Sequence, residues 1–193
     1  LHLLSRRQRQ MCIRDSSYLL HCFGELDQMA DVILVDTGAG IANHVLEFVL
    51  ASPEVLVVTT PEPTSLTDSY SLLKSLYRNP KFNREYTKIS VLSNRVISAA
   101  EGRGVYDKLN TVVGQFLEGE ITYAGMIPQD SALEKAIRMQ KPVSLQAPLS
   151  KSARAFEVVA AELLQGESSD AYRSFGLSRL FSGFWKQKNE GVE

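Results

Sequence analysis

Two groups near the start of the sequence have the residue types and the spacing to act on a nucleotide. The segment DVILV at 31–35 runs into Asp36, and a small turn, TGAG, follows. A carboxylate directly after a buried strand can hold Mg²⁺ through water, because Mg²⁺ keeps much of its hydration shell. Gly40 in the turn has no Cβ, so a backbone N–H there can approach a terminal phosphate closely. An unpartnered acid behind four apolar residues would be costly to bury, which favours a functional role for Asp36.

Two later segments also end in polar groups. The strand-like KISVLS at 88–93 precedes Asn94, whose amide can pair with a purine edge. The segment 122–127 precedes Pro128 and Asp130, and the Asp130 carboxylate can accept a hydrogen bond from a base. Each has a plainer alternative, because Asn94 can be a turn residue and Asp130 can be the N-cap of the next helix.

The elements that must position these groups alternate between strand and helix. Strands are expected at 31–36, 55–59, 88–96 and 122–127. Helices are expected at about 18–29, 43–50, 65–78, 102–118, 130–139 and 150–165, with Asn43 and either Thr64 or Ser65 as N-caps. This alternation predicts a three-layer α/β fold with a mostly parallel sheet, in which ligands bind at the carboxyl ends of the strands.

Bulk composition fits one soluble domain with additional segments. The chain has 193 residues, 44% of them hydrophobic, and a net charge of −1, so the molecule as a whole shows no attraction for nucleic acid. Its two cysteines form no CxxC pair, which argues against a zinc site and fits a reducing cytosol. Residues 1–16 keep no helical or strand period. They are interpreted as an unstructured or foreign leader in preference to a basic arm.

The C-terminal segment 171–188 follows a polar linker at 166–170 and has an amphipathic pattern. It contains four basic residues and no acidic one. Its apolar stripe at i, i+3, i+4 and i+7 consists of Leu177, Leu180, Phe181 and Phe184, with Trp185 beside it. A short basic and aromatic helix of this kind favours binding in the plane of an anionic membrane surface. The alternative is a helix that docks on the domain's own surface.

Four stretches of the sequence together resemble a known family. DVILVDTGAG, VLVVTTPEPTSLTDSYSLLKSL, VLSNRV and GMIPQDSALEKAIRMQKPV resemble the MinD/ParA-like deviant P-loop ATPases. Within that family they are most similar to the flagellar-number regulators of the FlhG, FleN or YlxH type, over about residues 25–164. The DTGAG turn and the TTPEPTSLTD segment are the most specific parts of this resemblance.

The resemblance implies ATP and Mg²⁺ as cofactors and assigns roles to individual residues. Asp36 corresponds to the aspartate that orients the magnesium shell without binding the metal directly. Gly40 belongs to the switch that senses the γ-phosphate. Asn94 resembles the asparagine that reads adenine, and Pro128 with Asp130 resembles the second segment that contacts adenine.

The chain also departs from this family. The family's KGGxGKT phosphate loop, or Walker A motif, is absent, and Gly24 is the only glycine before the DTGAG turn. The first strand and the first switch segment are missing as well. Residues 17–165 are therefore interpreted as an incomplete P-loop NTPase-like domain. We expect weak nucleotide binding and negligible hydrolysis, and no catalytic residue is assigned.

The function implied by the resemblance is that of the C-terminal part of a MinD-like ATPase that regulates flagellar number or placement. Such a protein would dimerise with ATP and associate peripherally with the inner face of the cell membrane from the cytoplasm. The implied partners are a second copy, a flagellar GTPase, switch-complex proteins or a transcriptional regulator, with nucleic acid disfavoured. The alternatives are a ParA-type partition ATPase that binds DNA and a non-enzymatic adaptor.

Overall fold

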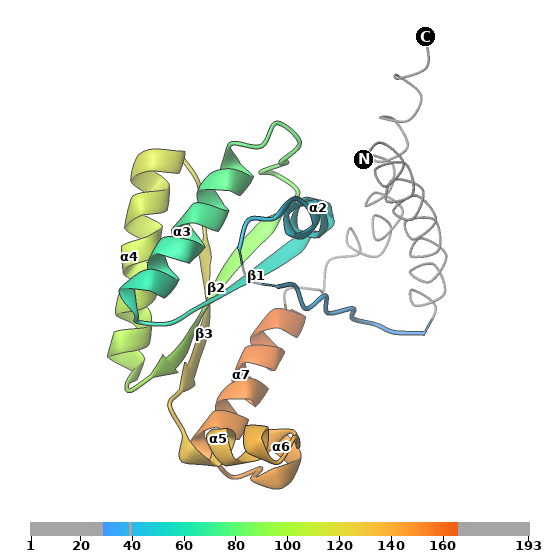
Figure 1. The fold of residues 1–193 in the computed structure, drawn as a ribbon, viewed down its shortest axis with the longest axis vertical. Helices are drawn as coiled ribbons and strands as arrows, with labels where there is room; N and C mark the ends of the chain where they lie inside the picture. The colour runs from blue at the N-terminus through green and yellow to red at the C-terminus, as the bar shows by residue number, and fades with distance from the viewer. Residues whose placement is uncertain (1–28, 39, 166–193) are drawn as a thin grey trace, which may run out of the picture. The chain divides into compact units, whose positions relative to one another are not determined.

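The computed structural model describes residues 29–38 and 40–165 (Figure 1). The chain divides into two units, residues 1–37 with 173–193 and residues 38–172. Several predicted features lie outside the described residues and stay predictions: the leader 1–16, most of the helix 18–29, the linker 166–170, and the membrane helix 171–188 with Leu177, Leu180, Phe181, Phe184 and Trp185.

Three strands form a parallel sheet in the second unit. They are β1 (Glu54–Thr59), β2 (Lys88–Val96) and β3 (Thr122–Pro128), and they lie in the order β1-β2-β3. Both pairings are parallel, with Val57 of β1 opposite Val91 of β2. Branched apolar residues are frequent in β1 and β2 because both faces of a parallel sheet are covered. The three strands predicted after residue 53 and their parallel arrangement are therefore confirmed.

Helices cover both faces of this sheet (Figure 1). α3 (Pro63–Tyr77) and α4 (Ala99–Leu117) lie on one face, and α7 (Lys151–Gln165) lies on the other. Successive strand residues point to opposite faces. Val57 accordingly belongs to the larger core with the leucines of α3 and α4, whereas its neighbour Leu56 packs against the cluster around α7. The predicted three-layer α/β fold is confirmed.

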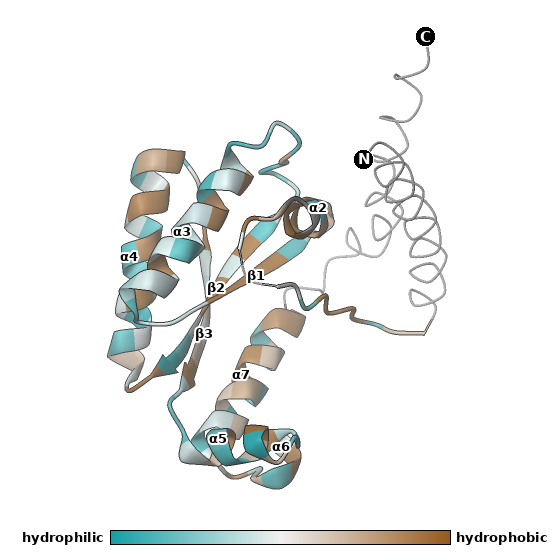
Figure 2. Cartoon of the chain, in the orientation of Figure 1, coloured by the Kyte–Doolittle hydropathy of each residue, from teal (hydrophilic) through white to brown (hydrophobic). Residues whose placement is uncertain are grey.

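Three shorter helices complete the second unit. α2 (Asn43–Ala51) is largely apolar (Figure 2) and contributes Val45 and Val49 to the larger core. α5 (Ser131–Arg138) and α6 (Val143–Gln146) connect β3 to α7. A small buried cluster joins these two helices to the start of α7, and it holds α5 close to the carboxyl end of β3. Its members are Ala136 of α5, Val143 of α6 and Ala153 of α7.

Two predicted N-caps are wrong. α2 begins at Asn43 itself, and Ala42 is its N-cap. α3 begins at Pro63, so neither Thr64 nor Ser65 caps it. Proline favours the first helical position because its φ is fixed in advance and its missing N–H would have had no partner there. Ser65 lies inside the helix instead. Its hydroxyl accepts a hydrogen bond from the backbone N–H of Thr60, which precedes the helix.

The predicted strand at 31–36 does not form. Residues 32–38 have irregular backbone, and Leu34 is 86% exposed. A strand is stable only when neighbouring backbone groups satisfy its N–H and C=O groups and other side chains cover its apolar face. Among residues 29–38 and 40–165, this segment pairs with no strand. Its apolar sequence alone therefore did not specify a paired strand, and Asp36 is exposed in backbone without regular secondary structure.

Candidate functional site

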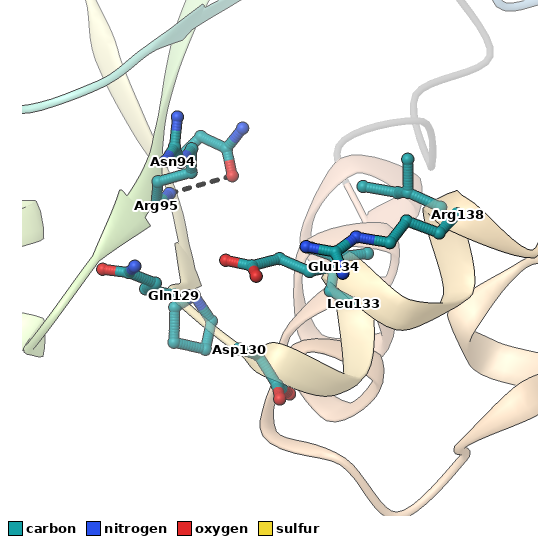
Figure 3. Close-up of a pocket in the computed structure, with 9 residues that line it drawn as sticks. Asn94, Arg95, Gln129, Asp130, Leu133, Glu134 and Arg138 are labelled. Atoms are coloured by element: carbon teal, nitrogen blue, oxygen red, sulfur yellow. Dashed lines mark hydrogen bonds between the residues drawn. The ribbon is translucent and has the colours of Figure 1, made fainter.

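A pocket of about 370 Å³ lies at the carboxyl ends of β2 and β3 (Figure 3). This volume falls within the usual range for small-molecule sites. In open α/β sheets, ligands bind at this end of the strands. Residues from both strands and from α5 line the pocket: Asn94, Arg95, Pro128, Gln129, Asp130, Leu133, Glu134, Ile137 and Arg138. The structure thus brings together three residues that the sequence nominated separately, Asn94, Pro128 and Asp130.

The end of β2 is irregular at Asn94 and Arg95. The register of β2 against β3 shifts between Asn94 and Val96. Arg95 has a φ of 57°, a left-handed conformation that costs a residue with a side chain about 1–2 kcal/mol. Its N–H donates to Oδ1 of Asn94 at 2.9 Å, the dashed line in Figure 3. The amide oxygen of Asn94 thus already accepts one hydrogen bond, and its Nδ2 is the group of this side chain that can donate to a ligand.

Asp130 has a structural role that the sequence left as an alternative. Its Oδ1 accepts from the N–H of Ala132 at 2.9 Å, which confirms Asp130 as the N-cap of α5. Its Oδ2 accepts from the N–H and the hydroxyl of Ser152 in α7, at 3.0 and 2.9 Å. In Figure 3 the carboxylate points away from Asn94 and Gln129. The Asp130 carboxylate already accepts three hydrogen bonds within the protein. Contact between Asp130 and a base stays a prediction.

These contacts predict how Asp130 affects stability. They hold the pKa of Asp130 below its ordinary value, chiefly through the N–H of Ser152 and next through that of Ala132. A depressed pKa stabilises the fold above the unfolded-state pKa, and this contribution is lost as the pH falls through the folded-state value. Asp130→Asn should therefore lower the melting temperature at neutral pH, and the difference should shrink below about pH 4.

Thermal unfolding followed by circular dichroism at several pH values measures this difference. Asp68→Asn, on the exposed side of α3, is the matched control and should melt as the wild type does at every pH. We call the hydrogen bonds of Asp130 with Ala132 in α5 and Ser152 in α7 the clamp. Equal melting temperatures for the wild type and Asp130→Asn at neutral pH would show that this clamp does not stabilise the fold.

Six residues of the pocket carry no binding role predicted from the sequence, and four of these lie on α5: Leu133, Glu134, Ile137 and Arg138. Their spacing of i, i+1, i+4 and i+5 places them on one side of α5. Leu133 is half-buried and Ile137 is 65% exposed, so the two supply an apolar wall. The sequence could have indicated these four residues. With Asp130 as the N-cap, they are the positions on the side of α5 that faces the pocket.

The residues of the DTGAG turn are not brought to this pocket by any described contact. Asp36 belongs to the other unit of the chain, and its predicted place in a magnesium shell stays a prediction. Gly40 has a φ of 104°, which side chains rarely adopt, and an added Cβ would meet nothing within 4 Å. Backbone conformation therefore explains a glycine at this position, and its contact with a phosphate stays a prediction.

Comparisons with known proteins bear on this arrangement. No protein-family model matches the chain. The antiactivator FleN of Pseudomonas aeruginosa is 40% identical over 145 residues, which cover 75% of this chain and 50% of FleN. The flagellum site-determining protein YlxH of Helicobacter pylori is 32% identical over 135 residues, which cover 69% of this chain and 44% of YlxH. The chain is thus similar to MinD/ParA-like ATPases of the FleN type.

A solved structure of the MinD/ParA-like family shares the fold. The septum site-determining protein MinD of Pyrococcus horikoshii, complexed with Mg-ADP, has a TM-score of 0.57 and 23% identity. The match covers 79% of this chain and 58% of MinD. The chain spans about half the length of the curated relatives it matches. The family resemblance inferred from the sequence is thus confirmed for the portion of the fold present here.

MinD/ParA-like proteins imply ATP and Mg²⁺, and the described residues fit the two parts of that ligand unequally. The pocket offers an amide donor at Asn94 and an apolar wall at Leu133 and Ile137, which suit a planar base. Within residues 29–38 and 40–165, no group of three or more His, Cys, Asp or Glu side chains could hold a metal ion. The 193 residues also include no Walker A motif. The donor set of the residues that the structure describes therefore fits the base and does not fit the magnesium triphosphate.

Proposed function

We propose that this chain is the base-binding portion of a MinD-like ATPase that regulates flagellar number or placement. The observation that carries the proposal is the shared pocket of Asn94 and Pro128, which come from neighbouring strands. The 40% identity with FleN and the 32% identity with YlxH support the flagellar part. In this proposal ATP and Mg²⁺ complete the site in the whole protein, where Asp36 and Gly40 face the phosphates.

The proposal includes partners that follow from the same relatives. A second copy of the protein would join it in an ATP-dependent dimer, as the resemblance implies. A transcriptional regulator is the favoured further partner, because FleN is named an antiactivator. A flagellar GTPase or switch-complex proteins are the alternatives.

Adenosine binding by the full chain tests the base site. Adenosine isolates the pocket, because the chain contains no Walker A loop to hold phosphates. We expect adenosine to shift the NMR amide signals of Asn94 and Gln129, with a Kd on the order of 1 mM, about −4 kcal/mol. Asn94→Ala should weaken binding roughly fivefold to tenfold, because one hydrogen bond is lost.

Asn110→Ala is the matched control, because this asparagine lies on the exposed side of α4. It should bind adenosine as the wild type does. Absence of any adenosine-dependent shift in the wild type, or equal binding by Asn94→Ala, would refute a base site in this pocket.

Peripheral membrane association is the second part of the proposal, and it rests on the amphipathic pattern of residues 171–188. Among the residues that the structure describes, no helix is long and apolar enough to cross a bilayer. Co-sedimentation with anionic liposomes should pellet the full chain and leave a chain without residues 171–193 in the supernatant. Neutral liposomes are the control. If both chains pellet equally with anionic liposomes, residues 171–188 are not the membrane anchor.

A further inference from the structure

The pocket contains two carboxylates, and they are differently placed. Asp130 directs its carboxylate away from Asn94, and both of its oxygens accept hydrogen bonds from Ala132 or Ser152. Glu134, one turn further along α5, directs its carboxylate toward Asn94 and Gln129 (Figure 3). Only the second carboxylate therefore faces the space in which a base would lie.

The Glu134 carboxylate is also available for a ligand. Within the part of the chain that the structure describes, its oxygens take part in no recorded hydrogen bond or ion pair. Arg138 lies one turn away and lines the same pocket, yet the two form no ion pair within 4.0 Å. Glu134 is exposed, and an ionised glutamate can only accept hydrogen bonds. The pocket thus presents one free acceptor group from α5.

Asn94 presents the complementary group. Its Oδ1 accepts from the N–H of Arg95, and its Nδ2, which can only donate, forms no hydrogen bond with the residues that the structure describes. Together, Asn94 and Glu134 offer a donor and an acceptor from opposite sides of one pocket. Adenine carries a matching pair, because its N7 accepts and its adjacent 6-amino group donates.

We infer that Glu134, and not Asp130, is the carboxylate that reads the amino group of the bound base. This inference rests on the proposed adenine-binding function and adds a specificity-determining residue to it. Asp130 is a positioning residue, which sets the start of α5 and thereby the place of Glu134. Leu133 and Ile137 supply the apolar surface beside the base.

Two nucleosides that differ only in the amino group test this inference on the full chain. Adenosine has the 6-amino group, and purine riboside lacks it. In NMR titrations the wild type should bind adenosine roughly fivefold to tenfold more tightly than purine riboside, because a hydrogen bond to a charged acceptor is at stake. Glu134→Leu should bind both nucleosides equally, and Glu134→Gln should retain part of the preference.

Two control variants separate a direct role from a structural one. Glu157→Gln, on the exposed side of α7, should keep the full preference for adenosine. Asp130→Asn should weaken the binding of both nucleosides by the same factor and keep their ratio. Retention of the preference in Glu134→Leu, or its loss in Asp130→Asn, would overturn the assignment.

The remaining outcomes distinguish this inference from the proposed function. If the wild type binds adenosine and purine riboside equally, the role of Glu134 is refuted while the base site stands. If neither nucleoside nor guanosine binds, the proposed function fails, and the inference fails with it. If guanosine binds more tightly than adenosine, the adenine assignment is overturned, since a carboxylate can also accept from the N–H groups of guanine.

Discussion

The purified 193-residue chain is expected to release no phosphate from ATP above the rate of a protein-free control. Phosphoryl transfer depends on positioning the phosphates and stabilising their charge, which the family accomplishes with loop amides, lysines and a directly held Mg²⁺. No G-x-x-x-x-G-K-[ST] motif occurs in these 193 residues, and Gly24 is the only glycine before the DTGAG turn. In the proposed function the pocket binds only the base, which is the part of ATP that does not react.

A coupled phosphate-release assay with Mg-ATP measures this result. Heat-denatured chain and Asn94→Ala are the controls, because a contaminating ATPase would be unaffected by Asn94→Ala. Turnover near the ordinary enzyme range of about 1–10³ per second, lost in Asn94→Ala, would contradict the expectation and would mean that the chain carries a complete phosphate site.

Leu76→Ala is expected to destabilise the fold by about 2–5 kcal/mol, the usual cost of truncating a fully buried leucine. Leu76 is 0% exposed and belongs to the larger core between α3, α4 and the sheet, with Leu73, Val91 and Val113. Small domains are stable by only about 5–15 kcal/mol, so this single change would remove a large share of the total.

Urea unfolding followed by circular dichroism measures the free energy of unfolding for this variant. Leu145→Ala in α6 is the matched control, because the same atoms are removed from a side chain that is 80% exposed. Its effect should stay within about 0.5 kcal/mol. Similar losses in the two variants would show that the core is not where the structure places it.

The sequence predicted the second unit well because its elements have strong local signals. The strands at 54–59, 88–96 and 122–128 each contain a short stretch rich in apolar residues, and each is followed by a helical period. α4 begins at Ala99, three residues before its predicted start, because Ser98 caps it and accepts from the N–H of Glu101 at 3.1 Å. Such a capping pair is visible in the sequence once the serine and the glutamate are read together.

The segment 31–36 shows where sequence reasoning failed. Its apolar run is as strong as that of β1, yet strand formation depends on neighbours that no local pattern specifies. The same limit applies to the pocket. Sequence position identified Asn94 and Pro128, because strand ends can be read directly, but it could not tell which of two nearby carboxylates faces the pocket. That choice depends on Ser152, which lies 22 residues beyond Asp130 in the sequence and donates to its carboxylate.

The clamp at Asp130 has a mechanical consequence. Its carboxylate accepts hydrogen bonds from the first turns of two helices, from Ala132 in α5 and from Ser152 in α7. The starts of α5 and α7 are therefore held together by one side chain. An occupant that displaces α5 must either swing α7 with it or break at least one of three hydrogen bonds. Residues 166–193 directly follow α7 in the sequence. A displacement of α5 that moves α7 would therefore also move the point at which the C-terminal segment is attached.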